Sequence, residues 1–96
     1  MGYMQTIEFK TTRFDEFEAL HEKWLAETAG ERTTLSEHIC RDRDKPDTYV
    51  LIVEFPSYEE AMRNNDLPAT ARVAEGMAAL ADAPLTFRNL DLIRVD

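Results

Sequence analysis

The segment Phe55–Pro68, FPSYEEAMRNNDLP, contains two helix starts separated by a break. Ser57, followed three residues later by Glu60, forms the capping-box pattern of a helix N-terminus. The helical pattern stops at the run NND, and Asp66 is the expected N-cap of a second helix with Pro68 in its first turn. The segment therefore predicts a short helix, a break and a longer helix.

Two extended segments precede this break. Thr48–Phe55, TYVLIVEF, is apolar at both alternating sets of positions between Tyr49 and Val53, which is typical of a central strand covered on both faces. Thr33–Asp42, TTLSEHICRD, is the other extended segment, and Arg43–Asp47 between them carries Asp and Pro, which suit a turn. The two segments are expected to form a hairpin.

The remaining elements follow from the spacing of apolar residues. Met4–Lys10, MQTIEFK, alternates like a strand, and Arg13–Gly30 has apolar residues at helical spacing. Gly30 is expected directly after the end of that helix, at the C′ position. The longer helix is expected to run to about Ala83, where a proline follows, and Leu85–Val95 is expected to be a closing strand.

The predicted element order is β-α-β-β-α-β, and 96 residues suffice for one domain, residues 1–96. This order favours an α+β, ferredoxin-like subunit with a four-stranded antiparallel sheet and both helices on one face. The other face would then expose some of Val50, Ile52, Phe87 and Leu92. A small domain gains by covering such a surface with a second copy, so a homodimer is expected.

Composition limits the partners and the compartment. The net charge is -8, with 19 acidic and 11 basic residues, and no run of basic residues is present. We therefore expect no nucleic acid and no membrane as partner. No charged and then apolar leader precedes Met4, so a cytoplasmic protein is expected. Cys40, the single cysteine, cannot form an internal disulfide and is expected to be a small buried strand residue.

These features together resemble the antibiotic biosynthesis monooxygenase-like proteins of the dimeric α+β barrel superfamily. The matching features are the aromatic Phe55 at a strand end, the capped opening Ser57–Ala61, the break Asn65–Pro68 and the last strand Leu85–Val95. The resemblance covers nearly the whole chain. It implies two sheets that meet back to back in a homodimeric α+β barrel, with a small-molecule cavity between helices and sheet in each subunit.

The resemblance does not imply one reaction, because related barrels include cofactor-independent oxygenases, haem-degrading enzymes, lactone isomerases and members without known activity. The haem-degrading branch has a haem-ligating His on its second helical segment, and Tyr58–Ala83 contains no His. The polyketide-oxidising branch has Asn, Trp, Tyr and Arg around its substrate, but the single Trp here, Trp24, lies on the first helix. Neither set carries over as a set, and no cofactor and no metal are expected.

The leading hypothesis is a cofactor-independent monooxygenase-like protein that acts on, or binds, a small aromatic or polyketide-type molecule. One alternative is a non-catalytic small-molecule-binding or structural dimeric barrel. A second is a lactone isomerase or decarboxylase of the same fold, which needs a general acid-base pair and no oxygen.

His38 and Glu54 are the catalytic candidates. If the hairpin is centred on Pro46, His38 stands opposite Glu54, and a His with a carboxylate partner is a credible general base. Centring the hairpin between Lys45 and Pro46 instead places Glu37 opposite Glu54 and moves His38 to the other face. The alternative for His38 is a hydrogen-bonded or interface histidine.

Five residues are candidates for substrate binding. His21 and Trp24 lie at the margin of the core-facing side of the first helix, where they either line a pocket or pack in the core. Asn65 either contacts a ligand at the cavity mouth or serves turn geometry. Arg72 and Arg88 either hold an anionic or enolate substrate or form surface ion pairs.

Overall fold

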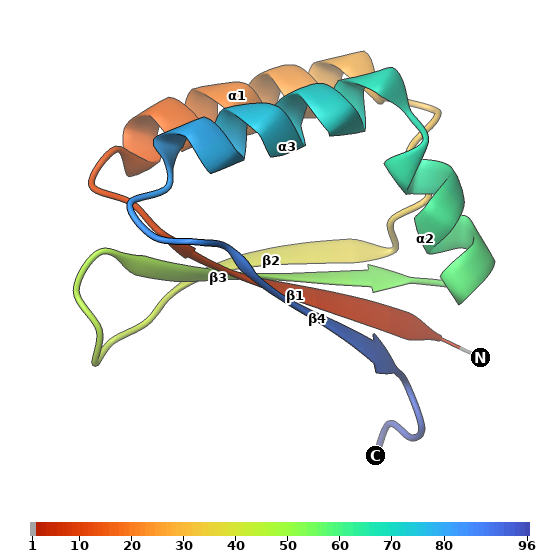
Figure 1. Ribbon diagram of the computed structural model, residues 1–96. Coiled ribbons are helices and arrows are strands. Elements are labelled where there is room, and N and C mark those ends of the chain that lie inside the picture. Colours follow the sequence, from red (N-terminus) through yellow and green to blue (C-terminus); the bar gives the residue numbers. More distant parts are fainter. Residues whose placement is uncertain (1) are drawn as a thin grey trace.

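The structure, a computed structural model that describes residues 2–96, has a sheet layer and a helix layer (Figure 1). In chain order the elements are β1 (Tyr3–Lys10), α1 (Phe14–Glu27), β2 (Ser36–Arg41), β3 (Thr48–Phe55), α2 (Tyr58–Asn65), α3 (Pro68–Leu80) and β4 (Thr86–Asp91). The strand order is β2-β3-β1-β4 and every pair is antiparallel. The predicted ferredoxin-like α+β fold is confirmed, with the second helix divided into α2 and α3.

The predicted central position of the strand Thr48–Phe55 is also confirmed. β3 pairs with β1 on one side and with β2 on the other. Helices α1 and α3 lie side by side over one face of the sheet, and α2 lies beyond the end of β3 (Figure 1). The strand alternation then places Leu51, Val53 and Phe55 under the helices, where all three are buried.

The register of the β2–β3 hairpin differs from both registers considered above. Ser36 stands opposite Glu54 and His38 stands opposite Ile52, so the turn is centred on Lys45. Asp47 has a φ of 57°, a left-handed conformation that aspartate tolerates better than most residues. The expected pairing of His38 with Glu54 is therefore wrong.

The start of α2 agrees with the sequence, and the start of α3 does not. Ser57 Oγ accepts a hydrogen bond of 3.1 Å from the backbone N–H of Glu60, as an N-cap should. The residue before α3 is Leu67, which makes no side-chain cap bond, whereas Asp66 is the C-cap of α2. Asp66 is thus not an N-cap, and α3 starts on Pro68, whose fixed φ suits a first helical turn.

Two other helix ends differ from expectation. α1 ends at Glu27, where the backbone N–H and the hydroxyl of Thr28 both donate to the carbonyl of Trp24. Gly30, with a φ of 81°, lies further along, in the turn that follows, so its expected C′ position is wrong. α3 ends at Leu80 and not near Ala83, since the backbone is already extended at the next residue.

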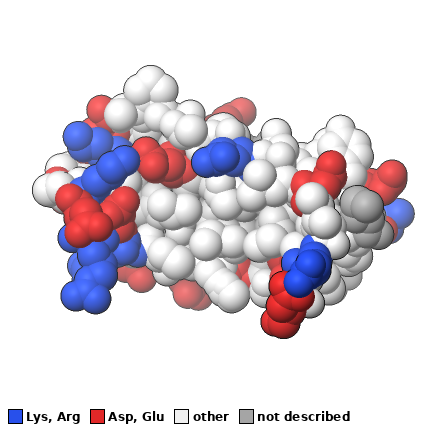
Figure 2. All heavy atoms as spheres, turned by 90° about the horizontal axis from the view of Figure 1, so that it is seen from below, with Lys and Arg blue, Asp and Glu red and all other residues white. Residues whose placement is uncertain are grey.

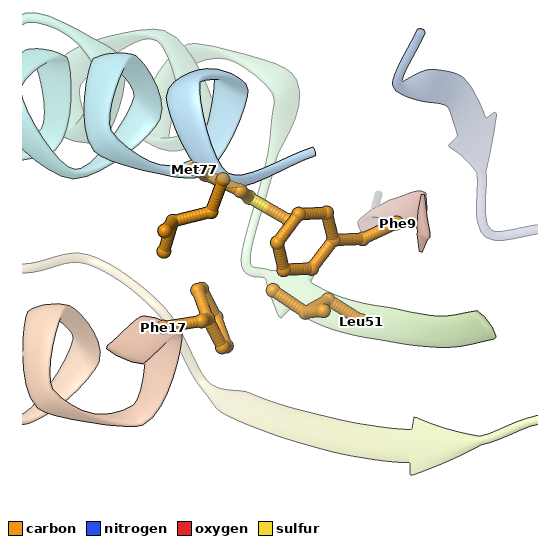
Figure 3. Close-up of a cluster of buried hydrophobic side chains, with 5 residues drawn as sticks. Phe9, Phe17, Leu51 and Met77 are labelled. Carbon is orange, nitrogen blue, oxygen red and sulfur yellow. The ribbon is translucent and has the colours of Figure 1, made fainter. Parts of the chain in front are cut away.

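The main core lies between the sheet and helices α1 and α3 (Figure 3). Phe9, Phe17, Leu51 and Met77 point toward one another there, and the Phe9 and Phe17 rings meet edge to face with centroids 5.3 Å apart. A second cluster, centred on Phe55, packs beside α2. The two clusters fix the helices over one face of the sheet.

The opposite sheet face is bare, and we call it the open face. It includes Val50 and Ile52 of β3 and Leu90 of β4, by the alternation of the paired strands. Figure 2 shows this face with an uncharged centre and charged side chains mostly toward its margins. Cys40 lies on the same face, since it pairs with Val50, and it is exposed, so its expected burial is wrong.

Within residues 2–96, none of the helices has the length and apolar character needed to cross a membrane.

Candidate functional site

A cavity of about 250 Å³ lies between α1, α3 and the helix-facing side of the sheet. Most of its wall is apolar, and four aromatic side chains contribute to it. The apolar lining includes Ile7, Phe17, Trp24, Leu51, Val53, Phe55, Val73, Met77 and Phe87. Such a wall suits a small ring system, because flat apolar ligands gain most from aromatic contacts.

His21 and Glu37 meet in this cavity. His21 Nε2 lies 2.5 Å from Glu37 Oε1, and their side chains are only 15% and 18% exposed. His21 lies on α1 one turn after the buried Phe17, which places it toward the sheet. Glu37 pairs with the buried Val53 and therefore lies on the helix-facing side of β2. The helical period of α1 and the strand alternation of β2 thus direct His21 and Glu37 toward the same space.

The pair has an electrostatic consequence. The hydrogen bond to Glu37 raises the pKa of His21 above its ordinary value of about 6.5. Burial and the positive charge of Arg32 oppose this rise, whereas the negative charges of Glu37 and Glu22 support it. A carboxylate that stabilises imidazolium makes the neutral imidazole a stronger base, which is the arrangement a general base requires.

Trp24 forms a fixed wall beside this pair. Its indole Nε1 donates a hydrogen bond of 3.0 Å to Thr70 Oγ1 on α3, which joins the two helices over the cavity. The rings of His21 and Trp24 have centroids 5.7 Å apart. The guanidinium of Arg32 lies 5.7 Å from the Trp24 ring centroid, at a cation–π distance. Trp24 therefore has little freedom to move away from His21.

Asn64 lies at the break between α2 and α3 and is buried, yet it lines the cavity. Its side-chain oxygen accepts from the backbone N–H of Thr33 at 3.3 Å. The hydroxyl of Thr33 in turn donates to the carbonyl of Glu60 at 2.6 Å. These two hydrogen bonds connect the segment before β2 to α2. The side-chain NH₂ group of Asn64 takes part in neither of them.

The structure brings three of the predicted site residues to the cavity. His21 and Trp24 lie side by side there, and the exposed Asn65 also lines it. Their roles in binding a substrate stay predictions.

The other four predicted residues lie elsewhere. His38 and Glu54 are on the open face, with His38 exposed and opposite Ile52. Arg88 pairs with Thr6 on the same face, and it is exposed. Arg72 forms an ion pair with Glu27 outside the cavity.

Sequence reasoning missed Glu37 as a site residue. Its signal was strand parity, because Glu37 shares a face with Ile39, whereas His38 shares the other face with Cys40. Among residues 2–96, no group of three or more His, Cys, Asp or Glu side chains is placed to hold a metal ion.

The architecture was compared with those of known proteins, and solved structures with the same fold were found. No family model and no curated relative matches the sequence. A proposed antibiotic biosynthesis monooxygenase from Caulobacter crescentus superposes with a TM-score of 0.84, at 12% identity, over 97% of this chain and 91% of the other. The chain has the fold of the antibiotic biosynthesis monooxygenases. The resemblance inferred from the sequence is thus confirmed for the fold.

Two further structures share the antibiotic biosynthesis monooxygenase fold with this chain. SnoaB from Streptomyces nogalater, described as a cofactor-independent oxygenase and solved in a mutant form, has a TM-score of 0.82 and 19% identity over 98% of this chain and 95% of its own. Rv0793 from Mycobacterium tuberculosis has a TM-score of 0.79 and 16% identity, over 99% of this chain and 98% of the Rv0793 chain. At such identities the likeness establishes fold and not activity.

Proposed function

We propose that the protein is a cofactor-independent oxygenase that takes a small aromatic molecule into the cavity, where His21, held by Glu37, removes a proton from it. The observation that carries the proposal is the 2.5 Å contact of His21 with Glu37 in the wall of an aromatic-lined cavity. The likeness to SnoaB supports the oxygenase class.

Each group then has a defined task. Phe17, Trp24 and Phe87 hold a flat ring, and the neutral imidazole of His21 accepts a proton from an acidic O–H or C–H group. Glu37 orients the ring of His21 and stabilises the imidazolium that forms. The amide of Asn64 is the donor that would meet negative charge developing on a substrate oxygen.

The oxygen step uses electrons from the substrate. Deprotonation of an activated CH₂ group gives a carbanion, and the carbanion transfers electrons to O₂ and forms a carbon–oxygen bond. Loss of water from the resulting hydroperoxide leaves a carbonyl, so that R₂CH₂ and O₂ become R₂C=O and H₂O. One oxygen atom enters the product and the other leaves as water, which accounts for the absence of any cofactor from the proposed scheme.

The proposed working form is a homodimer. Val50, Ile52 and Leu90 form an apolar part of the open face, and a domain of this size gains from covering such a surface. Two open faces meeting back to back would place the two cavities on the outer sides of the assembly.

A second candidate is a binding protein or an isomerase, in which oxygen plays no part. The observation that favours it is the position of the arginines. Arg72 is paired with Glu27 and Arg88 lies on the open face, so neither is placed to hold an anionic intermediate in the cavity.

The test is oxygen uptake with a panel of uncharged two-ring compounds that carry an activated CH₂ group, such as hydroxylated 2-tetralones and 2-indanones, together with product analysis. The oxygenase proposal expects O₂ consumption that His21→Ala reduces at least about 100-fold while the ligand still binds. His38→Ala is the matched control and should retain activity. Product without O₂ uptake would support an isomerase, binding without turnover a binding protein, and binding of no compound would contradict all three.

A further inference from the structure

We infer that the cavity selects uncharged phenols of one or two rings and rejects aromatic carboxylates of the same size, with Glu37 as the residue that discriminates. The inference rests on the proposed function, since it assumes that an aromatic ligand enters this cavity. It adds a charge and size rule for that ligand.

The charge of the cavity wall disfavours an anionic ligand. Within residues 2–96, the wall contains one carboxylate, Glu37, one histidine, His21, and neither Lys nor Arg. With neutral His21 the pair carries one negative charge, and with protonated His21 it carries none. In neither state is the wall positive, so a ligand carboxylate would find no counter-charge.

The nearby arginines are engaged outside the cavity wall. Arg32 contacts the Trp24 ring and donates to the carbonyl of Leu25 at 2.9 Å, and it does not line the cavity. Arg72 is paired with Glu27, and Arg88 lies across the sheet. Arg72 and Arg88 are therefore not placed to offset a second negative charge beside Glu37. The positive charge of Arg32 lowers the pKa of His21, but the Arg32 guanidinium is held by the Trp24 ring and the Leu25 carbonyl outside the cavity wall.

Glu37 also favours a ligand that donates a hydrogen bond. An ionised carboxylate only accepts hydrogen bonds, so a ligand group that approaches Glu37 must bring its own proton. A phenolic O–H satisfies this condition and can also reach His21, which is bonded to the same carboxylate. A ligand carboxylate would instead meet a like charge in a poorly solvated wall.

The volume of the cavity limits the size of the ligand. The volume of about 250 Å³ lies just below the range of about 300–1,000 Å³ that is usual for small-molecule sites. One or two fused rings match this space better than larger fused systems. The aromatic side chains of Trp24 and Phe87 provide contact area for such a ring.

The experiment compares three ligands that share one ring system. They are 2-naphthol, 6-hydroxy-2-naphthamide and 6-hydroxy-2-naphthoate, with affinities measured by calorimetry at about pH 7. The amide and the carboxylate have nearly the same shape and differ in charge. We expect 2-naphthol and the amide to bind the wild-type protein, and the carboxylate to bind at least about tenfold more weakly than the amide.

Two variants test whether Glu37 causes the difference in affinity between the amide and the carboxylate. Glu37→Gln removes the charge and should bring the affinities for amide and carboxylate within about threefold of each other. Glu75→Gln removes a charge on the exposed side of α3, outside the cavity wall, and should leave the wild-type ratio unchanged. Circular dichroism checks that both variants are folded.

The outcomes separate the inference from the proposed function. Equal wild-type affinities for amide and carboxylate would overturn the charge rule even if Glu37→Gln failed to fold, and so would a ratio that Glu37→Gln leaves unchanged. Tighter binding of anthracene-sized phenols than of 2-naphthol would overturn the size rule. If none of the phenols bound, the proposed function would fail and the inference with it.

Discussion

Glu37 Oε1 lies 2.5 Å from His21 Nε2, and this contact joins the edge strand β2 to helix α1 in the wall of the cavity. The contact has both a structural and a chemical consequence. The pair holds α1 against the edge of the sheet, and it gives the apolar cavity a base whose pKa is raised by its partner.

The pH dependence of stability should show this pair. Because folding raises the pKa of His21, protonation favours the folded state. The contribution is fully present below about pH 6.5, the pKa of free histidine, and is lost as pH rises through the higher folded pKa. Wild-type unfolding free energies should therefore fall relative to those of His21→Gln over that window, as measured by urea denaturation.

Glu37→Gln provides the control for this prediction. Without the carboxylate the pKa of His21 should fall toward or below its ordinary value, since burial then dominates. The pH-dependent difference from His21→Gln should shrink accordingly. An undiminished difference would show that another group, and not the His21–Glu37 bond, causes the dependence.

The bond from Trp24 to Thr70 should contribute measurably to stability. Thr70→Val leaves the buried indole N–H of Trp24 without its acceptor, at a cost of about 1–3 kcal/mol. The single tryptophan should also show a shifted emission maximum. Glu75→Gln, at an exposed position of α3 away from the open face, is the control and should change the unfolding free energy by about 0.5 kcal/mol or less. Equal effects of the two variants would exclude a stabilising bond.

Substitution of two phenylalanines should affect different properties, the stability of the fold at Phe9 and ligand binding at Phe87. Phe9 is fully buried in the main core, and Phe9→Ala should cost about 3–5 kcal/mol. Phe87 lines the cavity but is 52% exposed, so Phe87→Ala should cost about 1 kcal/mol or less while weakening 2-naphthol binding. Unaltered affinity in Phe87→Ala would remove β4 from the ligand site.

The open face should mediate dimerisation. Sedimentation equilibrium at micromolar concentration should give twice the chain mass for the wild-type protein and the monomer mass for Ile52→Lys, because a buried unpaired charge opposes association. Glu59→Lys, at an exposed position of α2, should remain dimeric. A monomeric wild-type protein would contradict the proposed assembly.

Much of the fold could be predicted because its signals are local. The cap at Ser57 is formed by the next turn of the same helix, and the apolar run Tyr49–Val53 reports burial on both faces. These features depend on residues that are close in sequence. They remain informative without knowledge of the tertiary structure.

The site depended on non-local geometry. A left-handed Asp47 in the turn contributes to a register that the residue types alone left open, and this register decides which face Glu37 and His38 occupy. The contact of His21 with Glu37 requires the packing of α1 on the edge of the sheet. From the sequence alone, His38 on its strand, with Glu54 as a plausible partner, was therefore favoured as the base over His21, which lies in the cavity.

The most direct test of the account follows the chain's two histidines by NMR during a 2-naphthol titration. His21 lines the cavity, whereas His38 is exposed on the open face. The account predicts saturable shifts of the His21 side-chain nitrogen and carbon resonances and of the Trp24 indole N–H, with His38 unmoved. Saturable shifts at His38, with His21 and Trp24 unchanged, would contradict it.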